Sequence, residues 1–557
     1  MSESLQSELV FLPLGGAGEI GMNLNLYGVG PEEDRKWLMV DLGVTFGDDR
    51  TPGIDLIMAD TTFIEDYADD IVGLVLTHAH EDHIGAVPHL WPLLECPVYA
   101  TPFTAALVRG KLKDVGLLDE VPLHEVPLGG SIDLDPFKVR FVTLTHSIPE
   151  PNALAIETPH GVVMHTGDWK IDPDPLIGEE TDRAALEALG DEGVLAIVCD
   201  STNVFEPGRA GSEAEVRQGL AEVIAPLTGR VAVTAFASNV ARVQTIAQVA
   251  DQCGRHPVLV GRSMHRCVAA ARACGHLQDM PPIIDEDEGA YLPPDKVLYI
   301  CTGSQGEPRA ALARIARNDH PSVKMEKGDT VVFSSRIIPG NEVGIIALKN
   351  DLAALGVDII TDHHSPIHVS GHPCRDELSQ MYQWIRPKIA VPVHGEFRHL
   401  QEHAQFARDM QVAETHVALN GTMVRLAPGP SAIIDEVPAG RLYLDGEILI
   451  RSDDEGLRQR KRISYQGYIH VTVVLDGKHQ LKAEPLIVLE GLPPEDWDGR
   501  DLDYCIGEAV DAALARMGPK DRKRDEPVAE KLRIAARRAA RDGAGKNPIT
   551  RVDVIRV

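Results

Sequence analysis

Three histidines and two acidic residues occupy the short segment His78–His83, whose sequence is His-Ala-His-Glu-Asp-His. The segment directly follows an apolar run, Ile71–Leu76, that has the length and composition of a buried strand. If these side chains were all charged they would gain nothing from burial, whereas neutral imidazole and carboxylate are good ligands for zinc and similar metals. The segment therefore predicts a metal site at the end of a strand, in preference to a chance histidine-rich loop.

One loop cannot close two metal sites, so further ligands are expected at other strand ends. His146, Asp168 and His394 each follow an apolar, strand-like run. Taken singly each is ambiguous, because a lone strand-end histidine or a Gly-Asp turn is often purely structural. Taken together with the His78–His83 segment, they predict a two-metal centre. Two such ions lower the pKa of a shared water, which is the chemistry of hydrolysis.

The elements that must position these residues change character along the chain. From residue 9 to about 200, short apolar runs alternate with turns and helices, as in a layered α/β domain. From about 207 to 350 the pattern becomes doubly wound, with a helix expected at Ser212–Ile224 and strands such as Val231–Thr234 and Thr330–Phe333. Histidines return after this stretch, so the first domain is predicted to be discontinuous, with the doubly wound part inserted.

Composition sets broad limits on function. A chain of 557 residues with 44% hydrophobic and 25% charged residues is expected to form several globular domains. The net charge of -30 argues against a protein that coats nucleic acid with its whole surface, although an enzyme with a local basic channel or metal ions remains compatible with it. Eight cysteines without C-x-x-C spacing and the lack of a membrane-spanning apolar run predict a cytoplasmic protein that does not engage a membrane.

Several segments together carry a family resemblance. The H-x-H-x-D-H segment with later His, Asp and His resembles the metallo-β-lactamase superfamily, and the long insert before the last histidine resembles its β-CASP branch, which acts on nucleic acids. Within that branch the chain resembles the ribonuclease J family nearly end to end. Besides the metal segment, the matching stretches are Leu14–Asn23, Gly167–Lys170, Asp200–Asn203, Phe236–Asn239, Thr302–Pro308, Ile338–Glu342, His368–His372 and Val393–Glu396.

This resemblance implies an α/β fold class: a metallo-β-lactamase αββα sandwich with an inserted β-CASP α/β domain and a small α+β C-terminal domain. The implied domains are the first part of the metallo-β-lactamase domain at 1–206, the β-CASP domain at 207–350, the return segment at 351–435, a linker at 436–465 and a C-terminal oligomerisation domain at 466–557.

The resemblance also implies a ligand set with two zinc ions per subunit, manganese being the alternative metal. His78, His80 and His146 are expected to hold one ion, Asp82, His83 and His394 the other, with Asp168 bridging both. Asp41 resembles the early acidic residue that orients ligands from behind them. The alternative is an ordinary turn aspartate after a strand.

Further roles follow from the same resemblance. His372 is the expected acid that protonates the leaving ribose oxygen, with Asp200 as its acidic partner and Asp168 between the metals. The residues expected to grip the RNA and its 5′ phosphate are Phe236, Ala237, Ser238, His368, Val369, Ser370, Gly371 and His372. A structural calcium ion is a weaker prediction at Asp48, Asp49 and Asp445, since exposed loop acids are usually just solvated.

The predicted activity is hydrolysis of single-stranded RNA from a 5′-monophosphorylated end, with endonucleolytic cuts, in messenger decay and ribosomal RNA maturation. The expected assembly is a homodimer or homotetramer that joins other members of an RNA decay complex. Two alternatives stay open: a DNA-directed or small-molecule hydrolase on the same fold, and a catalytically silent RNA-binding subunit. The inserted domain disfavours the small-molecule enzyme, and the complete ligand set disfavours the silent subunit.

Overall fold

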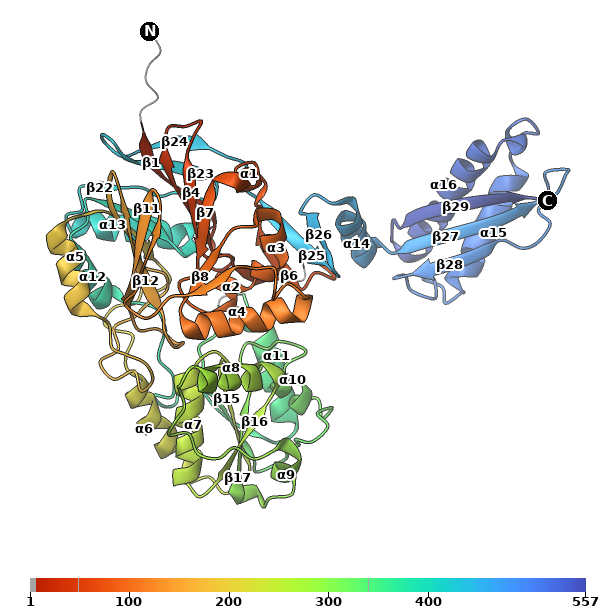
Figure 1. Cartoon of the computed structure of the whole chain (residues 1–557). Helices are drawn as coiled ribbons and strands as arrows, with labels where there is room; N and C mark the ends of the chain where they lie inside the picture. Colours follow the sequence, from red (N-terminus) through yellow and green to blue (C-terminus); the bar gives the residue numbers. More distant parts are fainter. Residues whose placement is uncertain (1–6, 49, 339) are drawn as a thin grey trace, which may run out of the picture. The chain divides into compact units, whose positions relative to one another are not determined.

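The structure is a computed structural model that describes residues 7–48, 50–338 and 340–557 (Figure 1). The chain divides into two units, one formed by residues 1–45 and 58–441 and the other by residues 46–57 and 442–557. Nearly all of the predicted site residues belong to the first unit, so the architecture of that unit determines the geometry of the site.

Two mixed sheets form the centre of the first unit. The eight-stranded sheet has the order β24-β23-β1-β3-β4-β7-β8-β9, with strands at Ala432–Glu436, Thr422–Ala427, Glu8–Gly15, Leu24–Gly30, Lys36–Val40, Ile71–Val75, Val98–Ala100 and Leu123–Glu125. The seven-stranded sheet has the order β10-β11-β12-β13-β14-β20-β22, with strands at Ser131–Leu134, Phe137–Thr143, Asn152–Thr158, Gly161–His165, Val194–Asp200, Ile389–Val393 and Glu414–Thr415. Short strands β2 (Ala17–Gly18) and β21 (Gly395–Glu396) pair in parallel.

The sheets pack face to face through their apolar inner faces. Phe11 and Tyr27 of the first sheet and Phe141, Leu154 and Val391 of the second belong to one buried cluster. Burying each such side chain stabilises the fold by about 1.5–3 kcal/mol, before the entropy of ordering is subtracted.

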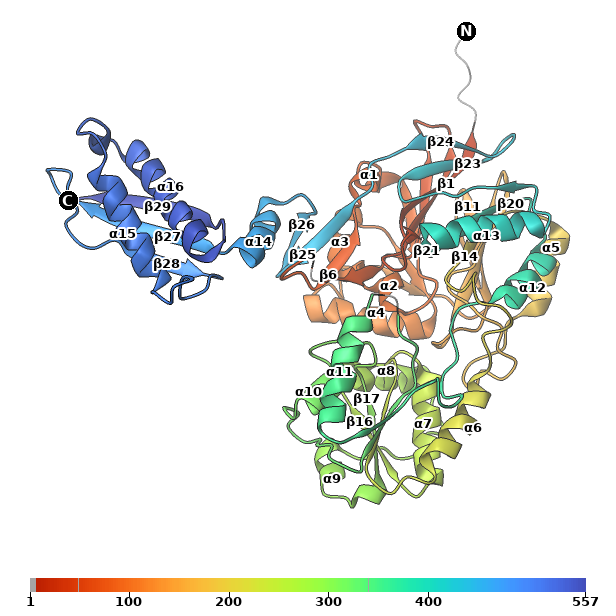
Figure 2. The ribbon, with the colours of Figure 1, turned by 180° about the vertical axis from the view of Figure 1, so that it is seen from behind.

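Helices cover the outer faces of both sheets. Behind the seven-stranded sheet lie α5 (Arg183–Glu192), α12 (Arg375–Ile385) and α13 (Phe397–Asp409), which share a second buried cluster with its strands (Figure 2). Against the eight-stranded sheet lie α1 (Thr62–Glu65), α3 (Val87–Leu94) and α4 (Pro102–Val115). The result is the predicted four-layered αββα sandwich.

Parallel strands bring the predicted site residues to one edge of the sandwich. Strands β4, β7 and β8 run parallel in one sheet, and β13, β14 and β20 run parallel in the other. Carboxyl ends of parallel strands meet at the same edge, so residues far apart in the sequence become neighbours there. The residues at these ends are Asp41 after β4, His78 after β7, Asp168 after β13, Asp200 at the end of β14 and His394 after β20.

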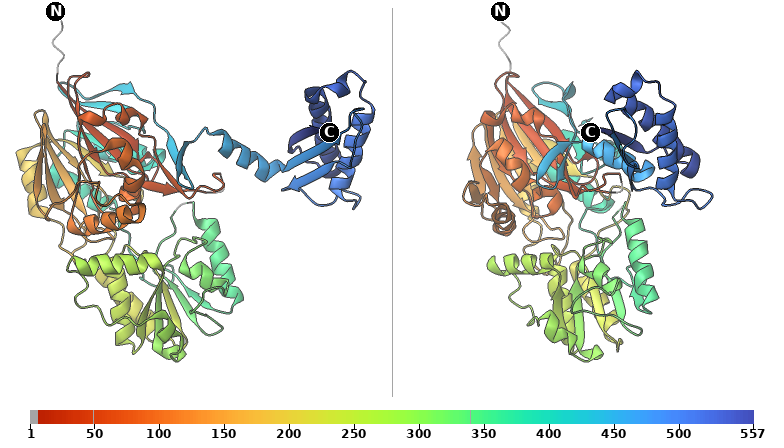
Figure 3. Two further views of the ribbon diagram at one scale, coloured as in Figure 1. Left: turned by 45° about the vertical axis from the view of Figure 1, so that its right-hand side comes forward. Right: turned by 90° about the vertical axis from the view of Figure 1, so that its right-hand side faces the viewer.

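The insert is a second α/β fold with a five-stranded parallel sheet. Its order is β16-β17-β15-β18-β19, with strands at His256–Val260, Val297–Cys301, Val231–Thr234, Thr330–Phe333 and Asp358–Ile360. Helices lie on both faces of this sheet (Figure 3). They are α6 (Glu213–Ile224), α7 (Val240–Gln252), α8 (Arg262–Ala273), α9 (Glu286–Ala290), α10 (Ala311–Ala316) and α11 (Glu342–Ala354), with a 3-10 turn at Pro294–Lys296. Strand β19 lies beyond residue 350, where the sequence places the end of the insert. The sequence pattern misses this strand because its three residues carry too short an apolar run to be recognised.

Two further small sheets complete the fold. In the first, β5 (Val44–Phe46) and β6 (Leu56–Ala59) continue the hairpin of β25 (Arg441–Asp445) and β26 (Ile448–Arg451). The segment predicted as a linker, 436–465, therefore contains strands and most of α14 (Glu455–Gln466). These elements were not predicted because the segment is polar and lacks the apolar runs that indicate buried strands and helices.

The second sheet has the order β28-β27-β29, with strands at Leu486–Glu490, Tyr468–Leu475 and Ile549–Arg556. It packs on α15 (Leu502–Ala515) and α16 (Asp525–Ala544), with a 3-10 turn at Asp521–Lys523 between them. Helix α16 buries Val528, Leu532, Ala536 and Ala540, whose four-residue spacing places them on one face.

The features that bear on cellular location are simple. All eight cysteines are free thiols, and four of them, at positions 96, 199, 301 and 374, are buried. Within the described part of the chain, none of the helices combines the length and apolar character needed to cross a membrane.

Candidate metal centre

The His78–His83 segment leaves the eight-stranded sheet as a loop that turns into the short helix α2 (Glu81–Ile84). Close packing of this turn requires Gly43, because a Cβ at that position would lie 1.7 Å from the Asp82 carbonyl oxygen. Asp41 and His394 both adopt left-handed backbone conformations, with φ of 63° and 52°. Such conformations cost a non-glycine residue about 1–3 kcal/mol and persist where surrounding contacts enforce them, commonly at functional sites.

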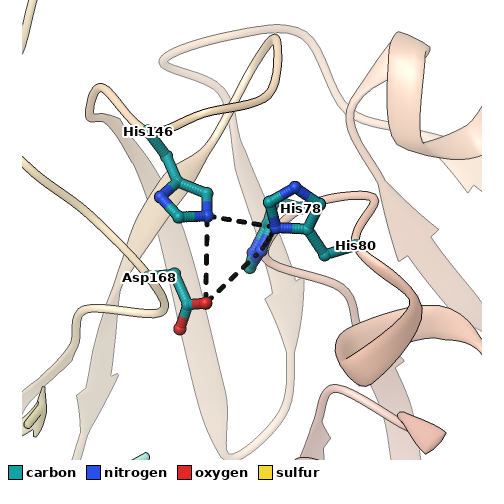
Figure 4. A group of neighbouring side chains, drawn as sticks. All are labelled: His78, His80, His146 and Asp168. Carbon is teal, nitrogen blue, oxygen red and sulfur yellow. Dashed lines mark hydrogen bonds and ion pairs between the residues drawn. The ribbon is translucent and has the colours of Figure 1, made fainter. Parts of the chain in front are cut away.

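His78, His80, His146 and Asp168 form the first group of converging side chains (Figure 4). The Nδ1 atom of His80 lies 3.1 Å from Nε2 of His78 and 3.0 Å from Nε2 of His146. Asp168 Oδ2 lies 3.8 Å from Nε2 of His78 and 3.9 Å from Nε2 of His146. One ligand atom of each residue therefore points into a common space.

Asp82, His83, Asp168 and His394 form the second group. Asp168 Oδ2 lies 3.3 Å from Nε2 of His83 and 3.5 Å from Nε2 of His394. Asp82 Oδ2 lies 3.5 Å and 3.7 Å from the same two nitrogens. The same Asp168 oxygen thus takes part in both groups, as the predicted bridging position requires.

The donor set fits borderline divalent cations. Burial, followed by repulsion from neighbouring imidazoles, holds the pKa of His78 and of His146 well below the usual value, and burial lowers the pKa of His80 to about 4. These rings are neutral at physiological pH, the form that binds metal. Asp168 is buried, yet the pKa of its carboxyl lies well below the usual value because the His394 and His83 imidazoles outweigh the effect of burial.

The second oxygen of Asp168 strengthens this fit. Asp168 Oδ1 is buried and has no hydrogen-bond partner among the described residues. Leaving a buried carboxylate oxygen unsatisfied costs about 1–3 kcal/mol or more. A coordinated cation would remove that cost.

Asp41 contacts His83 of the second group on the side of the ring that faces away from Asp168. Its Oδ2 atom lies 2.7 Å from Nδ1 of His83, and its Oδ1 atom accepts a 2.8 Å hydrogen bond from the Thr77 backbone N–H. With Nδ1 of His83 occupied in this way, Nε2 is directed toward Asp168. Asp41 therefore stands where an orienting residue is expected, in contact with a predicted ligand rather than in the space where the ligand atoms meet.

His372 and Asp200 form a separate pair beside the first group. Asp200 Oδ2 lies 2.8 Å from Nδ1 of His372. Although burial opposes the charged form, Asp200 and the more distant Asp168 and Asp82 raise the pKa of His372 to about 9. The loop that follows Asp200 supports this arrangement, because Asn203 Nδ2 donates to the His372 carbonyl oxygen and to Ser370 Oγ.

The predicted RNA-gripping residues occupy two segments of the first unit. Residues Phe236, Ala237 and Ser238 are half-buried in the turn between β15 and α7. In the other segment, His368, Val369 and Ser370 are half-buried, while the carbonyl oxygen of the buried Gly371 contacts Nδ1 of His146. Arg242 of α7 lies near both segments, since it donates to Ser334, whose hydroxyl in turn donates to the Ile367 carbonyl oxygen.

The acids predicted to bind a structural cation have protein partners. Asp48 Oδ2 accepts a 2.7 Å hydrogen bond from Arg50, and the Asp445 carboxylate accepts two hydrogen bonds from Arg460. Asp49 lies outside the described residues. The structural calcium ion stays a prediction.

Comparison with known proteins identifies the family. Four family models match successive parts of the chain: "Beta-lactamase superfamily domain" at residues 51–190, "Ribonuclease J, beta-CASP domain" at 228–352, "Zn-dependent metallo-hydrolase RNA specificity domain" at 356–418 and "Ribonuclease J C-terminal domain" at 456–557. A Ribonuclease J from Sinorhizobium meliloti is 46% identical over 99% of this chain and 98% of its own length. The chain belongs to the ribonuclease J family.

Other relatives of this ribonuclease J family member agree with the assignment. A Ribonuclease J from Corynebacterium glutamicum is 38% identical over 90% of this chain and 69% of its own length. Among solved structures, a protein of unknown function from Enterococcus faecalis matches with a TM-score of 0.51 and 15% identity, over 75% of this chain and 100% of the other. That likeness concerns the fold alone.

Membership in the ribonuclease J family confirms the predicted fold, with its sandwich, its β-CASP insert and its C-terminal domain. It also confirms that the chain is an RNA-hydrolysing enzyme of a zinc-dependent metallo-hydrolase type. The predicted alternative of a small-molecule hydrolase is thereby excluded.

Sequence patterns miss two residues that contact the predicted ribonuclease J ligands. Asn23 Oδ1 lies 3.0 Å from Nδ1 of His394, and its Nδ2 donates to the Asp82 carbonyl oxygen. Thr77 Oγ1 lies 3.0 Å from Nδ1 of His78. The only signal in the sequence is position, since Asn23 ends the glycine-rich Leu14–Asn23 stretch and Thr77 precedes the first histidine.

Proposed function

We propose that this ribonuclease J family member removes nucleotides from the 5′ end of single-stranded RNA, using two zinc ions per chain. The observation that carries the proposal is the single Asp168 oxygen that belongs to both groups of predicted ligands. A carboxylate in that position suits two neighbouring cations. In this proposal His78, His80 and His146 hold one ion, Asp82, His83 and His394 hold the other, and manganese is the alternative metal.

When bound, the two ions would lower the pKa of a water molecule and neutralise the charge of the scissile phosphate. The chain's own residues complete the reaction. His372 is charged through its contact with Asp200, and because Nδ1 faces that carboxylate, Nε2 is the atom that delivers a proton. The leaving 3′ oxygen of the ribose takes this proton as its bond to phosphorus breaks, and the remaining strand keeps a 5′ phosphate.

Recognition of the 5′ end is assigned to the segment 368–372 and to the turn 236–238. The Ser370 hydroxyl is held by Asn203, which also holds the His372 carbonyl oxygen, so a phosphate donor and the proposed proton donor share one support. The turn at 236–238 precedes α7 and presents backbone N–H groups near a helix N-terminus. The preference for a terminal monophosphate over a bulkier triphosphate is part of the proposal.

Several broader features belong to the same proposal. We assign the protein to the cytoplasm, to messenger decay and ribosomal RNA maturation, and to a homodimer or homotetramer within an RNA decay complex. Endonucleolytic cutting by the same centre is part of the assignment, as are the domain limits predicted above and a structural cation near Asp48 and Asp445.

A test uses uniformly labelled RNA carrying either a 5′ monophosphate or a 5′ triphosphate. The parent protein is expected to release mononucleotides from the monophosphorylated RNA faster, and His80→Ala is expected to abolish release. Metal analysis of the same samples should give about two zinc or manganese ions per parent chain. Absence of mononucleotides from both RNAs, with metal present, would falsify the exonuclease proposal.

A further inference from the structure

An exposed aromatic side chain stands on the loop that leads away from Asp200. Phe205 is 43% exposed, although its neighbour Val204 is fully buried. The guanidinium carbon of Arg398 lies 5.2 Å from the centre of the Phe205 ring, and the His399 ring lies edge-on at 5.3 Å. A single exposed ring is ordinary by itself, so the guanidinium held over the Phe205 ring is the feature that distinguishes this position.

The backbone around Phe205 is held firmly. The Arg375 backbone N–H donates to the Glu206 carbonyl oxygen at 3.0 Å, and the Arg375 guanidinium donates to the Val204 carbonyl oxygen at 3.1 Å. Arg375 also pairs with Glu402 of α13. Hydrogen bonds therefore hold the backbone on both sides of Phe205, at Val204 and Glu206. A loop held in this way loses less entropy when a ligand stacks on the ring.

This loop and the start of α13 are both tied to the proposed active site. Thr202 Oγ1 donates to the His394 carbonyl oxygen at 3.2 Å, and Arg398 and His399 follow His394 within five residues. Gly395 marks how closely the two segments pack, because a Cβ there would lie 2.8 Å from His399 Cβ and 3.2 Å from Ser201 Cβ. Phe205 and Arg398 thus belong to the two chain segments that begin at Asp200 and at the predicted ligand His394.

The charge of Arg398 is available to a ligand. Among the described residues, no carboxylate forms an ion pair with Arg398, and its side chain is exposed. An unpaired guanidinium over an exposed ring is suited to a nucleotide, because the ring stacks on a base and the cation adds both a cation–π contact and attraction for the adjoining phosphate. The exposed Glu206 and Glu396 nearby disfavour a site that binds phosphate alone.

We propose that Phe205 and Arg398, carried by the segments that follow Asp200 and His394, form a stacking platform for one base of the RNA strand. The inference rests on the proposed function and adds a contact with the base face of the substrate. It predicts that RNA long enough to reach the platform binds more tightly than RNA that is too short. Base stacking tolerates any sequence, so the platform suits an enzyme that degrades a strand without regard to sequence.

The test compares the parent with Phe205→Ala and Phe205→Trp on 5′-monophosphorylated RNAs of increasing length. Phe205→Ala is expected to raise KM for long RNA about 10-fold and to leave kcat within about twofold, while Phe205→Trp restores KM. In the parent, KM should fall with increasing RNA length until the RNA reaches the platform. Phe205→Ala should not show this fall in KM. Arg398→Ala is expected to raise KM less than Phe205→Ala does. The KM of Arg398→Ala should not depend more on RNA sequence than that of the parent.

Controls separate the platform from general damage. Tyr291→Ala removes a 90% exposed ring from the inserted domain and is expected to leave KM unchanged. Zinc content and the thermal midpoint should match the parent in every variant, and Phe205→Leu, which keeps apolar bulk without a ring, replaces Phe205→Ala if the latter does not fold.

The outcomes distinguish the two proposals. A parent that does not degrade RNA contradicts the proposed function. A parent that degrades RNA, with the same KM in Phe205→Ala or Phe205→Leu, overturns the platform alone. A changed sedimentation coefficient with an unchanged KM would show that Phe205 contacts a second copy of the chain, and this too would overturn it.

Discussion

Asp168 has one carboxylate oxygen at 3.3 Å from His83 and 3.9 Å from His146, while its other oxygen is buried without a partner among the described residues. A buried carboxylate is unfavourable unless positive charge offsets it. The residues around it divide into those that face this oxygen and those, such as Asp41 and Asn23, that hold the facing rings in place. Substitutions of the two kinds are expected to differ.

Replacement of Asp41 by Asn is expected to weaken zinc binding by about 10- to 100-fold without removing a ligand, because the contact that orients His83 loses its charge. Competition with a chelator measures the affinity directly. Asp69→Asn, at an exposed position, serves as the control. Zinc affinity equal to the parent's would mean that Asp41 does not orient the ring.

Replacement of His372 by Gln is expected to lower kcat by about 10²- to 10⁴-fold while zinc content stays the same, since the proposed proton donor is lost and the predicted ligands remain. Asp200→Asn should lower kcat less, because the imidazole is still present. Single-turnover rates on 5′-monophosphorylated RNA provide the measurement. A kcat near the parent's would remove His372 from the reaction.

At the scale of elements, the insert meets the sandwich through contacts between α8 and α4. Glu150 is buried in a left-handed conformation, accepts a 2.8 Å hydrogen bond from the Phe103 backbone N–H at the start of α4, and lies 3.1 Å from Nε2 of His276 just after α8. Arg266 and Asp114 form a second, exposed ion pair between the same helices. Losing one partner costs more at the first contact than at the exposed pair, because the group left behind stays buried.

Glu150→Ala is therefore expected to destabilise the first unit by about 1–3 kcal/mol, because it leaves the Phe103 N–H buried without a partner. Asp114→Asn, at the exposed pair, should change stability by less than about 1 kcal/mol. Urea unfolding of both variants gives the comparison. Equal effects would show that the buried contact carries no special weight.

Within the insert, a buried ion pair joins α6 and α7. Glu213 and Arg242 meet at 2.8 Å, both almost fully buried. Burial alone would raise the pKa of the Glu213 carboxyl, but Arg242 outweighs it and the pKa lies below the usual 4.5. A depressed pKa stabilises the fold above the unfolded-state value, and that stabilisation is lost as pH falls through the folded-state pKa.

Glu213→Gln is accordingly expected to cost about 3 kcal/mol at pH 7, where the parent has the full benefit of the pair. The difference between parent and variant should shrink as pH falls from the usual carboxyl pKa of 4.5 through the lower pKa of folded Glu213, because the parent's carboxylate becomes protonated over that range. Denaturant unfolding at several pH values follows this, with the exposed Glu222→Gln on the same helix as control. A difference independent of pH would contradict the assignment.

At the scale of the whole molecule, the predicted ligands all lie in one of the two units, although they span residues 78 to 394. Metal that binds only the folded state stabilises that state in proportion to the logarithm of its concentration over Kd. The effect should be confined to the unit that holds the site.

Removal of metal by a chelator is expected to lower the thermal midpoint of the larger unit and to leave the smaller unit unchanged. Calorimetry before and after chelation, followed by zinc addition, measures both transitions. Recovery on zinc addition is the control for irreversible damage. Equal shifts of both transitions would argue against a site within the larger unit.

Much of this protein was predictable from residue types and spacing. Strands at Val231–Thr234 and Thr330–Phe333 occur where their apolar runs predict them, because a buried strand requires such a run. The His78–His83 segment predicts ligands because few other functions bring so many imidazoles together. Short or polar elements such as β19 and the strands within 436–465 escaped prediction, since they carry no comparable pattern.

Local patterns establish which residues can do chemistry, and the packing of distant segments establishes which of them meet. Asn23 contacts His394 across 371 positions, and His146 contacts Gly371 across 225. Neither contact follows from spacing, because it depends on how two sheets stack and where an insert rejoins them. For the same reason the His78–His83 segment predicts metal from its composition alone, whereas its contact with Asp168, and the pairing of Phe205 with Arg398, exist only in the folded chain.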